Sequence, residues 1–184
     1  IVEVGGTVGD YEGLSFIEAI REYAHEVGRE NCLFVHVVYV PFLEASGEYK
    51  TKPAQNALAD LRGFGIMPDV VGVRTEGHNK PPKSIGDKIA ISSGVRQEGI
   101  IMMPNVRSVY EVPFTVSRDL GGLLAKFTDN STEPDLKRWK KLAERDTTEY
   151  KQEITIGLVA KYADNTDTYL SVTEALKSAA WAEK

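Results

Sequence analysis

The chain alternates between two hydrophobic patterns. In one, apolar residues recur every three to four positions, which is typical of a helix with one buried face. In the other, they form short continuous runs rich in valine and isoleucine, which is typical of a strand buried on both faces in a parallel sheet. The predicted helices are Leu14–Val27, Ala54–Gly63, Ser84–Ile91 and part of Tyr110–Leu124. The predicted strands are Ile1–Val4, Cys32–Val40, Asp69–Val73 and Gly99–Met103.

This order of strands and helices predicts an α/β fold with a mostly parallel sheet flanked by helices. Ile1–Val4 is expected to be the tail of a buried strand that begins before Ile1. Ligands of such sheets bind beyond the carboxyl ends of the strands. The polar motifs of this chain follow predicted strands, so we expect a binding site at that edge.

The composition changes in the last third of the chain. Thr128–Lys151 is rich in charged residues and contains one predicted amphipathic helix, Leu136–Arg145. Ile154–Ala160 then predicts a new strand and Leu170–Ala180 a helix. A single strand with its helix cannot build a core of its own. We therefore expect a first domain in residues 1–131, a linker in 132–151 and the start of a second domain in 152–184.

Charge and cysteine content narrow the possible functions. The 184 residues carry a net charge of −5, which disfavours a general nucleic-acid binder because such proteins need a basic face. No apolar run approaches the roughly 18–20 residues of a membrane span. The single cysteine, Cys32, excludes an internal disulfide and suits a cytoplasmic protein. Cys32 and His36 lie in a predicted strand and are interpreted as core residues.

A carboxylate and a glycine-rich turn come directly after the first predicted strand. Glu3 stands where nucleotide-binding α/β proteins often hold Mg²⁺, although a solvated strand-end charge is the alternative. The turn Gly5–Gly9 allows close approach of a ligand to the backbone, or serves the turn alone. It is not a P-loop, because the chain contains no Gly-x-x-x-x-Gly-Lys-Ser/Thr. Asp10 and Glu12 could cap the next helix or accept hydrogen bonds from a ribose or base.

The polar loop Glu44–Pro53 ends in a basic cluster. Lys50, Thr51 and Lys52 come just before the predicted helix at Ala54. Helix N-termini offer free N–H groups and partial positive charge, so they bind phosphate readily. A solvated basic loop is the alternative interpretation.

Several motifs together resemble the CTP synthase family. The segment Ile1–Glu12, with the sequence IVEVGGTVGDYE, is similar to a long signature of that family. Other matching segments follow in the family's order: Val35–Val37, Lys50–Gln55, Gly65–Asp69, Ser108–Pro113 and Ile156–Tyr162. The resemblance covers essentially the whole chain and is more specific than any single motif.

The resemblance implies both a fold and an activity. The fold is a P-loop NTPase-like synthetase domain followed by a class I glutamine amidotransferase domain. The activity is ATP-dependent amination of UTP to CTP through a 4-phosphorylated UTP intermediate, with ammonia taken from glutamine. Mg²⁺ is the implied cofactor, ATP the co-substrate, CTP a feedback inhibitor and GTP an effector. A cytoplasmic homotetramer is expected, in which the nucleotide pocket draws on neighbouring subunits.

The resemblance also assigns binding residues. Glu3 is the implied Mg²⁺ ligand. The implied UTP and CTP contacts are Asp10, Tyr11, Glu12, Lys50, Thr51, Lys52, Pro53, Ala54, Gln55 and Lys88. The implied ATP contacts are Arg74, Pro104, Asn105 and Val106. The sequence Pro104-Asn105-Val106 stands where the family usually has Lys-Asp-Val, which is a departure from the pattern.

By the same resemblance, a P-loop and a second metal carboxylate are expected before Ile1, and the glutaminase catalytic residues after Lys184. No residue of this chain is therefore assigned a catalytic role, and the 184 residues alone are expected to be inactive. Two alternatives remain open. One is a related P-loop ligase of the dethiobiotin-synthetase type, and the other is a non-catalytic paralogue that binds nucleotide or assembles into oligomers.

Overall fold

The computed structural model describes residues 1–76 and 81–182. The helices are α1 (Leu14–Val27), α2 (Lys52–Gly63), α3 (Lys83–Ser93), α4 (Val112–Thr128), α5 (Lys137–Thr147) and α6 (Leu170–Ala182). The strands are β1 (Val35–Val40), β2 (Phe42–Leu43), β3 (Glu48–Tyr49), β4 (Val70–Thr75) and β5 (Ile100–Pro104). Short 3₁₀ turns lie at Arg29–Asn31 (η1), Gln97–Gly99 (η2), Val109–Glu111 (η3) and Thr166–Tyr169 (η4).

The central sheet confirms the predicted α/β class. Its three strands are parallel and lie in the order β1-β4-β5. In the register, Val35 pairs with Val70, and Val71 pairs with Ile100. Helix α2 connects β1 to β4, and α3 connects β4 to β5, so two consecutive β-α-β units build the sheet.

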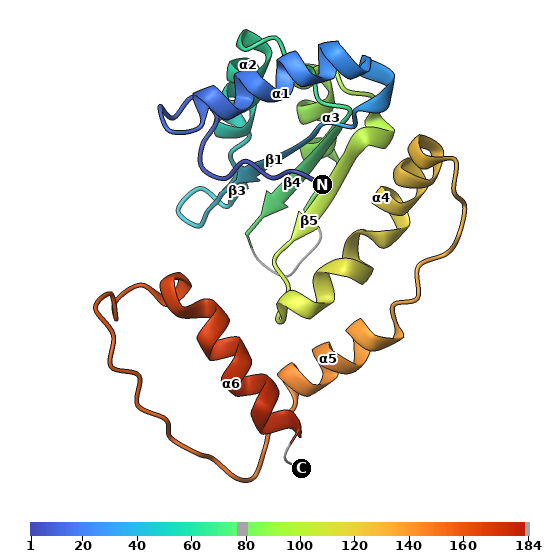
Figure 1. Cartoon of the computed structure of the whole chain (residues 1–184). Coiled ribbons are helices and arrows are strands. Elements are labelled where there is room, and N and C mark those ends of the chain that lie inside the picture. Colours follow the sequence, from blue (N-terminus) through green and yellow to red (C-terminus); the bar gives the residue numbers. More distant parts are fainter. Residues whose placement is uncertain (77–80, 183–184) are drawn as a thin grey trace.

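The main core lies between this sheet and helices α2 and α3. Apolar side chains alternate along β1 and β4, so every second one points to the same face. The core residues are Val38, Val40, Ala54, Leu58, Val71, Val73, Ile85, Ile89, Val95 and Ile100. Figure 1 shows the helices around the sheet, with α4 beside β5 and with α5 and α6 set apart.

Helix α1 has the bounds that its periodicity predicts. It ends before Gly28, whose φ of 93° is a conformation that favours glycine. Its buried Ile17 packs with Leu61 and Ile66 in a second, smaller core cluster. Helix α1 is therefore anchored to the carboxyl-terminal end of α2 and to the loop that leads into β4.

The predicted strand Cys32–Val40 is wrong in two respects. The strand begins at Val35, because Arg29–Asn31 form a 3₁₀ turn that Cys32 closes with its backbone N–H. It is also buried on one face only, since Val35, Val37 and Tyr39 remain 48%, 55% and 46% exposed. Helix α2 is the helix that packs substantially on β1 within the described residues, and it covers the face opposite to these three side chains.

Two other predicted strands do not form. Ile1–Val4 and Ile154–Ala160 have no strand assignment, and Ile1 and Ile154 are highly exposed. A strand exists only through backbone hydrogen bonds to a neighbouring strand. Within the described residues, no strand pairs with either segment, so a run of β-branched residues remains irregular.

The end of the chain is attached through an aromatic contact. The ring of Tyr110 in η3 lies 6.3 Å from Trp139 of α5 and 5.9 Å from Trp181 of α6, between ring centroids. The Tyr110 hydroxyl also donates a hydrogen bond of 2.9 Å to Glu174. This bond raises the pKa of Tyr110 above its ordinary value.

In the described part of the chain, no helix is both long and apolar enough to cross a membrane.

Candidate functional site

The carboxyl edge of the sheet carries a small hairpin. Strand β1 ends at Val40, and Pro41 leads into the antiparallel pair β2 and β3. The backbone N–H of Lys50 donates to the Pro41 carbonyl at 2.9 Å, which closes the base of the hairpin. The expected loop Glu44–Pro53 therefore contains strand β3 and the start of α2, and the hairpin delivers Lys50 to the first turn of that helix.

The start of α2 has the features of an anion-binding helix end. Thr51 precedes the helix, and its hydroxyl accepts a hydrogen bond from the Gln55 side chain at 3.1 Å instead of capping the backbone. The amides of the first turn therefore keep no side-chain cap and can donate to an anion. The Ala54 methyl group belongs to the core, so its backbone alone could contact a ligand.

One of the predicted nucleotide lysines pairs with a carboxylate of the hairpin, Glu48. Lys50 Nζ forms an ion pair with Glu48. The pKa of Glu48 is lowered mainly by this hydrogen bond from Lys50, and the positive charge of Lys88 on α3 makes the smallest of the contributions. Within the described residues, no ion pair joins Lys88 to Glu48. The sequence prediction missed Glu48, whose only signal is its position two residues before Lys50.

The glycine-rich turn before the other predicted nucleotide contacts is held by hydrogen bonds between Thr7 and Asp10. The Asp10 carboxylate accepts a hydrogen bond from the Thr7 N–H at 3.1 Å, and the Asp10 N–H donates to the Thr7 carbonyl at 3.0 Å. Helix α1 starts after Gly13 without a side-chain cap, so neither Asp10 nor Glu12 caps it. Tyr11 is 91% exposed and Glu12 is also exposed, which leaves both free to meet a ligand or another subunit.

Within one chain, this turn faces the opposite end of α2 from the lysine cluster. A shallow hollow beside Val8 and Gly9 is bordered by α2 residues from its second half and by the residue after it. These are Ala59, Asp60, Gly63 and Phe64. Asp60 lies eight residues beyond Lys52, or about 12 Å along the helix axis. Within the described residues, no hydrogen bond or ion pair joins residues 3–12 to residues 50–55 or Lys88.

The predicted ATP contacts lie together at the ends of β4 and β5. Arg74 Nη2 is 3.5 Å from Asn105 Oδ1, at the limit of a hydrogen bond. The Asn105 N–H donates to the Thr75 carbonyl at 3.2 Å, and Thr75 pairs with Pro104 in the sheet. The side-chain hydroxyl of Thr75 is buried without a hydrogen-bond partner in the described part of the chain. Val106 follows at the start of the next loop.

The implied Mg²⁺ has one candidate ligand in this chain. Glu3 is exposed, and its Oε1 atom lies 3.6 Å from the point where a Cβ on Gly5 would stand. Among residues 1–76 and 81–182, no group of three potential metal-ligating side chains occurs. Protein-bound Mg²⁺ commonly takes one or two carboxylates together with substrate phosphates. Glu3 fits one such position, but it does not form a metal site by itself.

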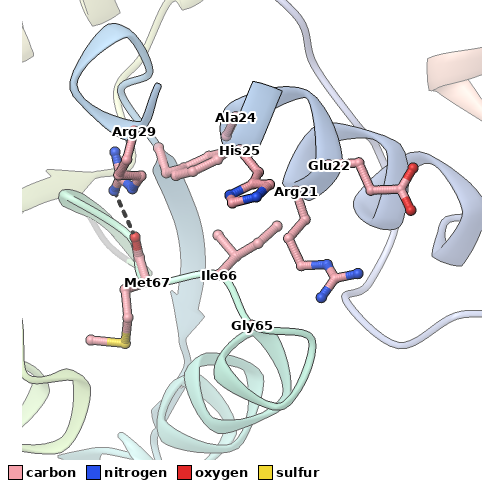
Figure 2. A pocket seen from close by; sticks show the side chains of 9 residues that line it. Arg21, Glu22, Ala24, His25, Arg29, Gly65, Ile66 and Met67 are labelled. Atoms are coloured by element: carbon pink, nitrogen blue, oxygen red, sulfur yellow. Dashed lines mark hydrogen bonds between the residues drawn. The ribbon is translucent and has the colours of Figure 1, made fainter. Parts of the chain in front are cut away.

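A second hollow lies at the opposite end of the sheet, before β1 and β4. It has a volume of about 530 Å³, and Figure 2 shows Arg21, His25 and Arg29 around its rim. Arg29 donates to the Met67 carbonyl at 3.1 Å and to the Asp69 carboxylate at 2.8 Å. These bonds tie η1 to the loop before β4, so Arg29 stabilises the fold.

The parallel sheet and its two β-α-β units define an α/β protein, and its carboxyl edge carries the hairpin and the uncapped start of α2. A family model described as "CTP synthase N-terminus" matches residues 1–126. The chain therefore belongs to the CTP synthase N-terminal family.

Named relatives agree with this family assignment. The chain is 45% identical to a CTP synthase of Treponema denticola over 183 residues, which cover 97% of this chain and 33% of the relative. It is 44% identical to a CTP synthase of Methanocaldococcus jannaschii, over 96% of this chain and 32% of the relative. It is 43% identical to a CTP synthase of Corynebacterium glutamicum, over 99% of this chain and 33% of the relative. The chain thus spans about a third of the length of these relatives.

Proposed function

We propose that this chain supplies part of the UTP subsite of a CTP synthase, which aminates UTP to CTP with ATP and glutamine-derived ammonia. The observation that carries the proposal is the start of α2, which has no side-chain cap and follows Lys50 directly at the base of the hairpin. This arrangement occurs in a chain whose relatives are named CTP synthases. Lys88 of α3 is exposed, and its positive charge makes the smallest of the contributions that lower the pKa of Glu48 on the same hairpin.

In this proposal, the triphosphate of UTP replaces Glu48 as the partner of Lys50, and the exposed Lys88 contacts the same triphosphate. Both lysines lie near solvent, and the uncapped first turn of α2 adds backbone N–H donors. A phosphate carries more negative charge than one carboxylate and offers more acceptor oxygens. It can therefore displace the exposed Glu48 ion pair, which is weak in water.

The same proposal divides the pocket between subunits. Asp10, Tyr11 and Glu12 lie near the far end of α2 from Lys52, so one chain does not place them around one nucleotide. We propose that they complete the pocket of a neighbouring subunit in a homotetramer. Glu3 contributes one carboxylate to a Mg²⁺ that the phosphates share. Arg74 and Asn105 contact ATP at the adjoining strand ends.

The proposed reaction has two steps. O4 of UTP attacks the γ-phosphorus of ATP, so an O–P bond forms and ADP leaves. Ammonia then adds to C4, and inorganic phosphate leaves as the C–N bond forms. Bound Mg²⁺ offsets the charge of the phosphate oxygens. Lys50, Lys88 and the α2 amides hold the triphosphate, while GTP acts as an effector.

Nucleotide binding by the full-length protein tests the subsite. Lys50→Ala and Lys88→Ala should each weaken UTP binding by about tenfold, because each removes a charge-assisted contact to phosphate. Calorimetry measures the change, and Lys140→Ala, an exposed lysine of α5, is the matched control. Unchanged UTP affinity in both variants would refute the proposed subsite.

Turnover tests the rest of the proposal. Glu3→Ala should abolish ammonia-dependent CTP formation by the full-length protein. The 184 residues alone should form no CTP from UTP, ATP, Mg²⁺ and ammonia, since their sequence contains no P-loop. Binding of UTP by the full-length protein without any turnover would instead support a non-catalytic nucleotide binder.

A further inference from the structure

Glu76, directly after β4, contacts both strands of the hairpin. Its carboxylate accepts a hydrogen bond from the Tyr39 hydroxyl and another, of 3.1 Å, from the Phe42 backbone N–H. Its own carbonyl accepts a hydrogen bond of 3.3 Å from the Tyr49 hydroxyl. One residue therefore receives three hydrogen bonds from β1, β2 and β3.

Two of these hydrogen bonds come from Phe42 and Tyr49, the pair of residues that defines the hairpin. Phe42 and Tyr49 are cross-strand partners, and their rings meet edge to face with centroids 4.9 Å apart. Lys50 is the next residue, and its N–H closes the hairpin base on Pro41. Any displacement of β3 is therefore transmitted directly to Lys50.

The hairpin needs such an anchor. Each of its strands has two residues, and an isolated two-stranded hairpin is at best marginally stable in water. Tyr39 of β1 and Phe42 of β2 donate to the Glu76 carboxylate, while Tyr49 of β3 donates to the Glu76 backbone carbonyl. The hydrogen bonds from Tyr39 and Phe42 lower the pKa of Glu76, so its carboxylate is ionised at neutral pH.

We propose that Glu76 is a positioning residue that fixes the hairpin so that Lys50 faces the triphosphate of UTP. The anchoring follows from the contacts above, whereas the identity of the ligand rests on the proposed function. Glu76 acts through the hairpin and does not touch the nucleotide. Its role is therefore geometric, and it depends on hydrogen-bond acceptance more than on charge.

A pair of substitutions separates geometry from charge. Glu76→Ala removes both side-chain acceptors. Glu76→Gln can still accept from the Phe42 N–H, and its amide can donate to the Tyr39 oxygen, so the anchor survives without the charge. Glu44→Ala is the control, since Glu44 is an exposed carboxylate on the same hairpin.

Steady-state kinetics of the full-length protein give the first measurement. Glu76→Ala should raise the KM for UTP at least about threefold, with kcat and the KM for ATP little changed, because the lysine is misplaced and not removed. Glu76→Gln and Glu44→Ala should behave like the wild type. If Glu76→Gln loses as much as Glu76→Ala, the charge itself is required and the positioning role is refuted.

Hydrogen exchange without nucleotide gives the second measurement. In Glu76→Ala, the amides of Phe42 and Lys50 should exchange at least about tenfold faster than in the wild type, while β4 amides stay unchanged. Equal exchange at Phe42 and Lys50 would overturn the anchoring, whatever happens to UTP. Faster exchange in a protein whose wild type binds no UTP would uphold the anchor and refute the proposed function.

Discussion

The β1–β5 sheet region and the C-terminal region of residues 129–182 are held together in different ways. The sheet region has a continuous core between three parallel strands and two helices. Within the described residues of the C-terminal region, the buried apolar side chains are those of Ala143 and Trp181. This region is attached mainly through the rings around Tyr110 and the polar contacts of Glu174.

The difference shows what a β-α-β unit needs in order to build a core. Two such units in sequence pair three strands and enclose the side chains between sheet and helices. The single run Ile154–Ala160 has no partner strand among the described residues. Helix α6 instead contacts η3 through the rings of Trp181 and Tyr110, and α5 through the Lys177–Asp146 ion pair. We therefore expect the sheet region to unfold as one unit, and α6 to detach locally at a lower free energy.

The largest effect is expected in the sheet core. Leu58 is completely buried, so Leu58→Ala should reduce the free energy of unfolding by about 2–5 kcal/mol through lost contacts and a cavity. Leu124→Ala, at a leucine of α4 that is 41% exposed, is the matched control and should cost much less. Denaturant unfolding measures both. Equal costs would contradict the location of the core.

The next effect tests whether the C-terminal attachment is local. Trp181→Ala should lower the opening free energy of α6 by roughly 3 kcal/mol, because it removes a buried aromatic ring. Hydrogen exchange should show faster exchange in α6 and unchanged exchange in β4. If β4 amides are destabilised equally, the two regions unfold together and the comparison fails.

A half-buried histidine offers a smaller, pH-dependent test of the sheet. Burial lowers the pKa of His36, and its Nε2 atom has no hydrogen-bond partner in the described part of the chain. The unfolded chain therefore binds a proton at the ordinary pKa of about 6.5, whereas the folded chain binds it only at a lower pH. Stability should fall as the pH drops below that value, which is the direction linkage requires.

His36→Leu should remove this pH dependence and add about 1 kcal/mol of stability at pH 5, since an unpaired polar atom leaves the core. Thermal unfolding at pH 5 and pH 7.5 measures the change. His25→Leu, at an exposed histidine of α1, is the control and should change stability by less than about 0.5 kcal/mol. A wild-type stability that is flat between these pH values would contradict the burial argument.

The smallest effect concerns the polar part of the C-terminal attachment. The pKa of Glu174 is lowered mainly by the hydrogen bond from Lys177, with a further contribution from Tyr110. Its contribution to stability should therefore be present above the ordinary glutamate pKa of about 4.3 and be lost as the pH falls through the lowered value. The attachment of α6 should therefore weaken only in this lower pH range, whereas the effect of His36 on the sheet begins near pH 6.5.

Tyr110→Phe keeps the ring contacts and removes the hydrogen bond to Glu174. We expect it to lower the opening free energy of α6 by about 0.5–1.5 kcal/mol at neutral pH. Hydrogen exchange in α6 measures this change, and the difference from wild type should shrink below about pH 4. A constant difference at all pH values would show that the bond does not depend on the Glu174 charge.

Local sequence patterns determined much of the architecture. The periodicity of Leu14–Val27 gave both ends of α1, and the apolar runs placed β4 and β5 to within two residues. The charged stretch Thr128–Lys151 predicted one amphipathic helix at Leu136–Arg145, and α5 (Lys137–Thr147) forms there. These features depend on the spacing of apolar side chains along one segment, which the sequence displays directly.

The candidate site was predictable where one segment carries it. The cluster Lys50–Gln55 lies at a helix start as its sequence indicated. Arg74 and Asn105 meet because Arg74 lies near the end of β4 and Asn105 follows the neighbouring β5. Glu48 and Glu76 were not predictable, because isolated carboxylates in polar loops carry no pattern. The role of Glu76 comes from partners on other elements, Tyr39 on β1 and Phe42 on β2.

The sequence by itself therefore determined which segments can be helices or strands, and the family to which the chain belongs. The tertiary structure decided which apolar runs become strands, which face of β1 is covered, and which charges lie together. The physical reason is that helix hydrogen bonds close within one segment, whereas strand pairing, burial and ion pairs depend on residues that are distant in the sequence.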